Sequence, residues 1–196
     1  MKRVLLTILG VDPKPAEYAR GEERQIARLA PVALFGLLPP AERPEVVVAL
    51  CTEQARLKTL PELEAALSGK AEVLSADIPS GADAQDVDRF LRAMVTACEK
   101  HADSAVAVDV THGYRHFSFL MYTGALYLAA LGRVTIDAIY YALLNAQPQL
   151  SPFFDLTPLP ELPRWVHAIE TLRETGSAKV VAKLLRGHRG WCRLGE

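Results

Sequence analysis

Short apolar runs, rich in β-branched residues and bounded by glycine, proline or charged residues, recur along the first 157 positions of the chain. Runs of this length with such boundaries are typical of strands buried on both faces of a sheet. Six are predicted, at residues 4–9, 45–50, 72–78, 104–109, 134–141 and 153–156. Helical segments separate most of them. We therefore expect an α/β fold with a mostly parallel central sheet of about six strands and helices on both faces.

The helical segments are recognised by apolar spacing and by residues that begin or end a helix. Helices are predicted at residues 31–38, 59–67, 83–98 and 114–131. Pro31 suits the first turn of its helix and not a helix interior, which leaves residues 18–29 as an extended arm. Asp83 and Thr59 are the expected N-terminal caps of two other helices, and Gly132 ends the fourth.

The composition changes after residue 157. Closely spaced prolines begin at Pro158 and mark a boundary. Beyond them, apolar residues from Trp165 to Leu172 share one helical face, and a second short helix is predicted at residues 179–185. We therefore divide the chain into a domain of residues 1–157 and a helical extension or linker of residues 158–196.

Composition excludes several classes of protein. A net charge of −1 and a pI near 6.5 argue against binding of extended nucleic acid over a broad basic surface. Cys51, Cys98 and Cys192 include no CxxC pair, so neither a disulfide framework nor a zinc knuckle is indicated. The most apolar window, residues 117–131, is shorter than the roughly 20 residues of a transmembrane helix. We expect it to be a core helix in a cytoplasmic protein without a membrane partner.

One predicted strand ends in a polar turn that leads into a helix. The strand at residues 104–109 is followed by Thr111, His112 and Gly113, and the helix begins near Arg115. The first N–H groups of a helix lack intrahelical partners, and with the helix dipole they favour an anion. Thr111 and His112 add side-chain donors, and Gly113 lets a ligand approach the backbone. Together these groups suit a phosphodiester.

The loops at residues 10–15 and 51–53 follow two other predicted strands and are expected to border the same crevice. Two further interpretations of the polar turn remain open. Asp109, His112 and His116 could be metal ligands, although a strand-end carboxylate need not converge with an imidazole on a helix. These side chains could also serve only to stabilise the turn. A serine triad and a dinucleotide fingerprint are not indicated, because their glycine-containing motifs are missing.

The segment Asp109-Val-Thr-His-Gly-Tyr-Arg115 closely resembles the Asp-x-Thr-His-Gly-Phe/Tyr-Arg motif of CRISPR-associated CARF domains, in the subgroup of type III accessory effectors. Weaker similarities along residues 1–157 follow the family's order: Leu9-Gly10 and then Tyr18, Thr52-Glu53, Ile78-Pro-Ser-Gly81, and Tyr140-Tyr141. The resemblance implies a Rossmann-like sensor domain that forms a homodimer. It also implies binding of a cyclic oligoadenylate, cyclic tetra- or hexa-adenylate, across the twofold axis. From the residues themselves we expect no metal or other cofactor.

The polar turn, the bordering loops and the resemblance together give the candidate ligand-binding residues: Gly10, Val11, Asp12, Thr52, Asp109, Thr111, His112, Gly113, Tyr114, Arg115 and His116. The resemblance further implies allosteric control of an effector domain attached in cis, in type III CRISPR antiviral defence. We expect no effector within residues 158–196, since the spacing of Arg186-Gly-His188 is too short for the ribonuclease motif. An alternative is a metal-independent ring nuclease, in which His112 or His116 moves protons and Arg115 stabilises the phosphorane.

Overall fold

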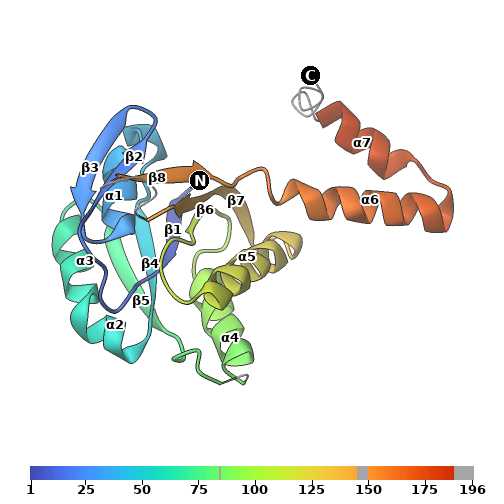
Figure 1. The fold of residues 1–196 in the computed structure, drawn as a ribbon. Helices are drawn as coiled ribbons and strands as arrows, with labels where there is room; N and C mark the ends of the chain where they lie inside the picture. The colour runs from blue at the N-terminus through green and yellow to red at the C-terminus, as the bar shows by residue number, and fades with distance from the viewer. Residues whose placement is uncertain (84, 145–149, 188–196) are drawn as a thin grey trace. The chain divides into compact units, whose positions relative to one another are not determined.

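The computed structural model describes residues 1–83, 85–144 and 150–187, and it divides the chain into two compact units, Met1–Thr157 and Pro158–Glu196 (Figure 1). The division falls at the first of the closely spaced prolines, Pro158. His188 and Cys192, which entered the sequence interpretation, lie outside the described residues.

The first unit is built around one sheet, in which eight strands are described. These are β1 (Arg3–Ile8), β2 (Ala16–Arg20), β3 (Glu23–Ala27), β4 (Val46–Cys51), β5 (Glu72–Asp77), β6 (Ser104–Asp109), β7 (Val134–Ala142) and β8 (Leu150–Asp155). Their spatial order is β3-β2-β8-β7-β6-β1-β4-β5. The described pairs run parallel except β2–β3 and β7–β8, which are antiparallel. The expected Rossmann-like, mostly parallel α/β architecture is therefore confirmed.

The expected number of strands was too low, because the extended arm predicted at residues 18–29 largely forms a hairpin of β2 and β3. β2 pairs in parallel with β8, with Tyr18 opposite Ser151, so the hairpin extends the sheet. Tyr18 is completely buried, whereas Glu17 and Arg20 on the same strand are only half-buried. These charged residues interrupt the apolar run by which the central strands were recognised.

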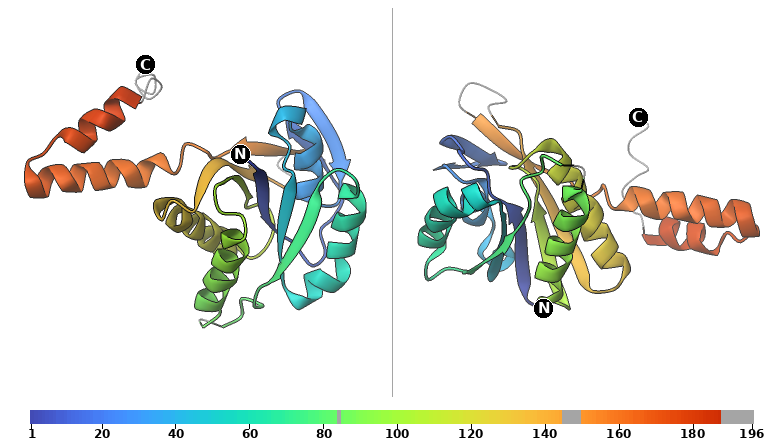
Figure 2. Two further views of the ribbon diagram at one scale, coloured as in Figure 1. Left: turned by 180° about the vertical axis from the view of Figure 1, so that it is seen from behind. Right: turned by 90° about the horizontal axis from the view of Figure 1, so that it is seen from below.

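Helices cover both faces of the sheet, as predicted. One face carries α1 (Ala30–Leu37), α2 (Glu53–Lys58) and α3 (Leu60–Leu67), and the other carries α4 (Asp86–Glu99) and α5 (Arg115–Ala130) (Figure 2). The side chains of alternate residues of β1 point to opposite faces of the sheet. Leu6 and Ile8 pack with residues of α4 and α5, and Leu5 packs with residues of α1 and α3. β1 is thus a central strand buried on both faces, as its sequence predicted.

The structure corrects three details of the helices. α2 was not predicted, because its six residues are mostly polar and show no apolar period. Thr59 does not cap α3 with its side chain, since its hydroxyl donates to the carbonyl oxygen of Ala55 at 2.8 Å. α4 begins at Asp86 and not at Asp83, whose carboxylate instead accepts a 2.9 Å hydrogen bond from the Gln85 N–H.

The second unit contains a pair of helices, α6 (Glu161–Thr175) and α7 (Lys179–Gly187). The apolar face predicted for α6 is largely uncovered within the described residues, with Ile169 49% exposed and Ala168 buried. In the part of the chain that the structure describes, no helix combines the length and apolarity needed to cross a membrane. The window at residues 117–131 instead packs in the core of the first unit through Phe117 and Met121.

Candidate ligand-binding site

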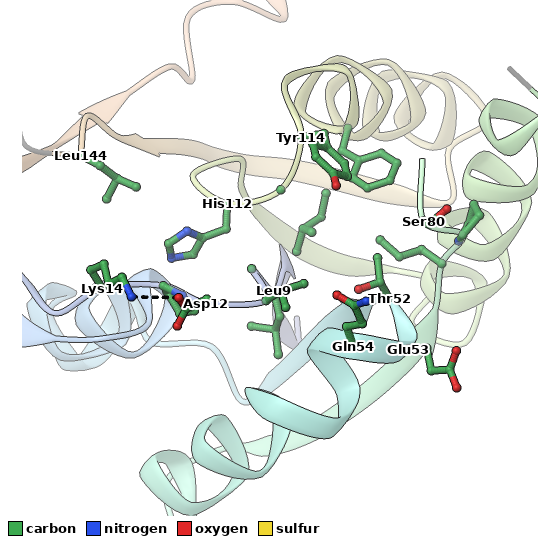
Figure 3. Close-up of a pocket in the computed structure, with 18 of the residues that line it drawn as sticks. Leu9, Asp12, Lys14, Thr52, Glu53, Gln54, Ser80, His112, Tyr114 and Leu144 are labelled. Carbon is green, nitrogen blue, oxygen red and sulfur yellow. Dashed lines mark hydrogen bonds and ion pairs between the residues drawn. The ribbon is translucent and has the colours of Figure 1, made fainter. Parts of the chain in front are cut away.

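A cavity of about 800 Å³ opens at the carboxyl ends of β1, β4, β5 and β6 (Figure 3). β1 pairs with β4 on one side and with β6 on the other, so the strand order reverses at this point. In open α/β sheets, ligands bind in the crevice at such a reversal. The loops that follow β1 and β6, which the sequence predicts to border one crevice, both line this cavity.

The structure separates the candidate residues into two groups. Those that line the cavity are Gly10, Val11, Asp12, Thr52, His112, Gly113 and Tyr114. Those outside its lining are Asp109, Thr111, Arg115 and His116. Further lining residues that were not among the candidates include Lys14, Glu53, Gln54, Ser80 and Leu144.

Asp109 ends β6 with its side chain completely buried. One carboxylate oxygen accepts a 2.9 Å hydrogen bond from the hydroxyl of Thr7 on β1, and the other accepts a 3.0 Å bond from the N–H of Thr111. The hydroxyl oxygen of Thr111 accepts a 2.9 Å bond from the N–H of Ala142 at the end of β7. These bonds fasten the turn after β6 to the strands on both sides of it. Asp109 and Thr111 thus position the cavity wall and do not face the cavity.

A glycine is required at position 113, because of the backbone conformation there and because of the atoms that lie next to it. Its φ of +94° is one that side chains rarely adopt, and a Cβ there would lie 3.1 Å from Cγ2 of Ile8. The backbone consequently lies directly against β1. Tyr114 then precedes the first residue of α5 without providing a side-chain cap. The amino end of α5 therefore meets the cavity beside Gly113 and Tyr114, as an anion site requires.

His112 joins the cavity wall to helix α1. Its side chain is only 8% exposed, and its Nε2 atom accepts a 3.3 Å hydrogen bond from the N–H of Ala30, the first residue of α1. Burial lowers the pKa of His112, and the nearby carboxylate of Asp109 opposes this shift. The bond to Ala30 and the lowered pKa both favour a neutral imidazole at pH 7.

The remaining residues of the motif lie at the mouth of the cavity or outside it. Tyr114 is 62% exposed, and its ring stacks on that of His116 with centroids 5.7 Å apart. His116 also contacts Phe117, at 4.6 Å between centroids, and lines a separate cavity of about 260 Å³. Arg115 is exposed on the first turn of α5. Of these three motif residues, only Tyr114 borders the main cavity.

The three side chains considered as metal ligands do not converge. Asp109 is bonded to Thr7, His112 is bonded to Ala30, and His116 stacks on Tyr114. Within residues 1–83, 85–144 and 150–187, no group of three or more His, Cys, Asp or Glu side chains is placed to hold a metal ion.

The loop after β1 is held in place from several sides. The Nζ of Lys14 donates a 2.8 Å hydrogen bond to the carboxylate of Asp12, and this bond lowers the pKa of Asp12. Because both side chains are exposed, the ion pair adds little stability. Stronger anchors come from buried or half-buried donors. Arg28 donates to the carbonyl oxygen of Pro13 at 3.2 Å, and the single hydroxyl proton of Thr59 is shared between the carbonyl oxygens of Ala55, at 2.8 Å, and Gly10, at 3.0 Å.

The opposite wall comes from the start of α2 and the loop after β5. Thr52 caps α2 by accepting a 3.3 Å bond from the Ala55 N–H, which leaves its hydroxyl proton available as a donor. Figure 3 shows the Gln54 side chain turned toward the cavity and the Glu53 carboxylate directed away from it. Ser80 adds a hydroxyl on the same side. This wall therefore offers amide and hydroxyl groups.

The charges of the lining almost cancel. Lys14 is neutralised by Asp12, Glu53 adds a negative charge, and His112 is neutral. The net charge of the cavity does not attract an anion. An anionic group would have to be held by the N–H groups beside Gly113 and by hydroxyl donors, with Arg115 close by on α5.

Two kinds of signal could have identified the additional lining residues. Lys14 lies in the loop at residues 10–15, which was expected to border the site although this side chain was not selected. Gln54 becomes a candidate only once α2 is recognised, because the helix cap at Thr52 turns its side chain toward the cavity. Leu144 follows β7, and nothing in the local sequence relates it to the other loops.

Comparison with known proteins gives two kinds of similarity, and no protein-family model matches the chain. Over 82 residues, or 41% of this chain, the sequence is 27% identical to the CRISPR-associated protein MJ1674 of Methanocaldococcus jannaschii, and the match covers 13% of that protein. The fold matches Csm6 of Enterococcus italicus, whose structure was solved with cyclic hexa-2'-fluoro-hexa-dAMP bound. The TM-score is 0.57, with 10% identity, over 95% of this chain and 49% of Csm6.

The chain thus spans about half of the length of Csm6 and a smaller part of MJ1674. The likeness to Csm6 is one of fold, because an identity of 10% carries little sequence information. The similarity to MJ1674 is independent of it, since it rests on the sequence alone. A Rossmann-like sheet, a cavity at its strand-order reversal and sequence similarity to a CRISPR-associated protein are each consistent with the resemblance of the Asp109–Arg115 motif to that of CARF domains.

Proposed function

We propose that the unit Met1–Thr157 is a sensor that binds a cyclic oligoadenylate, cyclic tetra- or hexa-adenylate, in the cavity at the ends of β1 and β6. The observation that carries this proposal is the placement of Gly113 and the start of α5 at the cavity, in a fold similar to that of a Csm6 solved with a cyclic hexa-adenylate analogue. A volume of about 800 Å³ lies toward the upper end of the range of roughly 300–1,000 Å³ for small-molecule sites.

The chemistry of the two walls suggests how such a ligand would be oriented. Phosphates face the turn at Gly113, where N–H groups and the dipole of α5 favour negative charge. The wall formed by α2 offers no cationic side chain to a phosphate, since it is lined by Thr52, Glu53 and Gln54. That wall suits base edges instead, because the amide of Gln54 can pair with N6 and N7 of adenine. Leu9 and Pro79 add apolar surface for the base rings.

We further propose that the ring binds across the twofold axis of a homodimer. α5 begins at the cavity and carries exposed aromatic side chains, Phe119 at 72% and Tyr127 at 55% exposure. These residues are eight positions apart and share one helix face. Exposed apolar surface of this kind is typical of an interaction site. Sedimentation of the Phe119→Glu variant checks this proposal, since a charge on the interface should yield monomers.

In this proposal the ligand controls an effector domain attached in cis, in type III CRISPR antiviral defence in the cytoplasm. Control of this kind requires two states of the dimer that differ in affinity for the ring. The free energy available for switching is set by that difference, and ligand contacts shared by both states contribute nothing to it.

Thermal unfolding tests ligand binding directly. A ligand that binds only the folded state stabilises it by about 2.7 kcal/mol when present at 100 times its dissociation constant. We expect cyclic tetra- or hexa-adenylate to raise the melting temperature, and linear hexa-adenylate to raise it much less. Equal shifts with the linear and cyclic forms, or no shift with either ring, would contradict the proposal.

The ring nuclease remains a second candidate function, because His112 reaches the cavity and its pKa is lowered. Cleavage would require a base at a ribose 2′-hydroxyl aligned with its phosphate. Incubation of the protein with each ring in EDTA, followed by product analysis, tests it. Linear products with 2′,3′-cyclic phosphate ends would support cleavage, and recovery of intact rings would exclude it.

A further inference from the structure

The amino end of α1 depends on a side chain from a distant part of the chain. The N-cap residue Leu29 provides no side-chain hydrogen bond, and Pro31 has no N–H. The N–H groups of Val32 and Ala33 both donate to the carbonyl oxygen of Leu29. The N–H of Ala30 then remains, and it donates to Nε2 of His112, 82 residues further along the chain.

This bond fixes the proton on the other nitrogen of the His112 ring. A nitrogen that accepts a hydrogen bond carries no proton, so the neutral ring is protonated at Nδ1. Nδ1 lies on the side of Gly10, because a Cβ built on Gly10 would lie 3.7 Å from it. Both Gly10 and His112 line the cavity. A single N–H donor of known identity is therefore present at the cavity wall.

We infer that His112 is a two-sided positioning residue: Nδ1–H donates to an acceptor oxygen of the bound ligand, while Nε2 holds the amino end of α1. This inference rests on the proposed function and adds a residue role to it. Ala30 packs with Tyr18 of β2 in a small separate core, so the bond connects the cavity to the hairpin as well. In this role His112 is a hydrogen-bond donor and not a general base. Cleavage of the ring by His112 would first require the bond to Ala30 to break.

Two substitutions of His112 test the roles of its two ring nitrogens, Nδ1 and Nε2, independently. In His112→Gln, the amide can place an oxygen near the position of Nε2 and keep the bond to Ala30, but the donor at Nδ1 is lost. In His112→Asn, the shorter amide can place its NH₂ near the position of Nδ1, but it cannot reach Ala30. His167→Gln on α6, where the histidine is exposed, is the matched control for the chemical change.

We expect opposite results from the two variants. His112→Gln should keep the melting temperature of the wild type and bind cyclic hexa-adenylate about tenfold more weakly, the loss of about one hydrogen bond. His112→Asn should bind within a few-fold of the wild type after correction for the folded fraction, but melt about 2–4 °C lower. The two variants behaving alike in both measurements would overturn the inference.

The tautomer of His112 provides a test that does not depend on ligand binding. Nitrogen NMR of the full chain, with His112 assigned by the His112→Gln spectrum, distinguishes protonation at Nδ1 from protonation at Nε2. The inference predicts the Nδ1–H tautomer, and an Nε2–H tautomer would overturn it. If the wild type binds neither ring, the proposed function fails, but the tautomer and the stability difference still decide whether His112 holds α1.

Discussion

The carboxylate of Asp109 accepts a 2.9 Å hydrogen bond from the hydroxyl of Thr7, and both side chains are completely buried. The two residues are 102 positions apart, and their bond joins β6 to β1 where these strands end at the cavity. In Asp109→Ala, the Thr7 hydroxyl and the Thr111 N–H lose their acceptor. The buried Thr7 hydroxyl costs about 1–3 kcal/mol when it is left unpaired, and the part-buried Thr111 N–H adds a smaller cost. We therefore expect a loss of roughly 2–4 kcal/mol in the unfolding free energy, measured by urea denaturation.

Asp109→Asn is the matched control for this change. The amide has the same shape and keeps one acceptor oxygen, so Thr7 or Thr111 retains its partner. We expect a smaller loss of stability than in Asp109→Ala. If the two variants were equally destabilised, the hydrogen bonds would not be what holds the turn.

Gly113→Ala should be more harmful than the same substitution at Gly132. Both glycines have positive φ, and a Cβ in such a conformation costs about 1–2 kcal/mol. At Gly132 the added atom meets nothing within 4 Å, whereas at Gly113 it would press on Ile8 at 3.1 Å. We expect Gly113→Ala to lose more stability and also to weaken ligand binding. Equal stability losses, measured by denaturation, would show that the turn does not lie tightly on β1.

The lowered pKa of His112 gives its contribution to stability a defined pH dependence. The unfolded chain binds a proton at His112 as the pH falls below the ordinary value of 6.5, whereas the folded protein binds this proton only at a lower pH. The contribution of His112 to the unfolding free energy is therefore fully present above pH 6.5. It is lost as the pH falls below 6.5, with a slope of at most about 1.4 kcal/mol per pH unit.

Urea denaturation of the wild type and of His112→Gln between pH 8 and pH 5.5 measures this contribution. The unfolding free energy of the wild type should decrease relative to that of His112→Gln as the pH falls. His101, whose pKa is also lowered by burial, is present in both proteins and cancels in the difference. A difference that does not change with pH would mean that His112 titrates normally in the folded state.

The two cysteines in the described part of the chain should be unreactive in the native protein. Cys51 and Cys98 are buried, and burial raises the pKa of Cys51 to about 11 and that of Cys98 to about 12. The thiolate is the reactive form, so alkylation at pH 8 should be slow. Peptide mapping by mass spectrometry should find both residues labelled only after unfolding in urea. Rapid native labelling of either would show that its side of the sheet opens.

Much of the fold could be predicted because its central elements are locally consistent. β1, β4 and β6 are buried on both faces and therefore read as continuous apolar runs, and the stripe of α4 gives a clear helical period. The position of the glycine turn after β6 beside a cavity could be predicted, because a turn between a strand and a helix lies at the carboxyl end of the strand, where the crevices of open α/β sheets form.

The features of the fold and of the cavity that could not be predicted depend on contacts between distant parts of the chain. The strand character of β2 comes from its pairing with β8, and its own sequence contains charged residues that obscure it. Nothing near His112 indicates that its ring caps α1, and nothing near Asp109 indicates that Thr7 is its partner. Sequence patterns therefore identified the motif as a whole, but not which of its side chains face the cavity and which support it.

Isothermal titration of the full chain with cyclic hexa-adenylate, and in parallel with cyclic tetra-adenylate, tests the central claim most directly. We expect saturable binding of one of the two rings, with one ring bound for every two chains, and weaker binding by the Gly113→Ala variant but not by Gly132→Ala. Absence of binding by both rings, or binding that Gly113→Ala leaves unchanged, would contradict the assignment of this cavity as a cyclic oligoadenylate site.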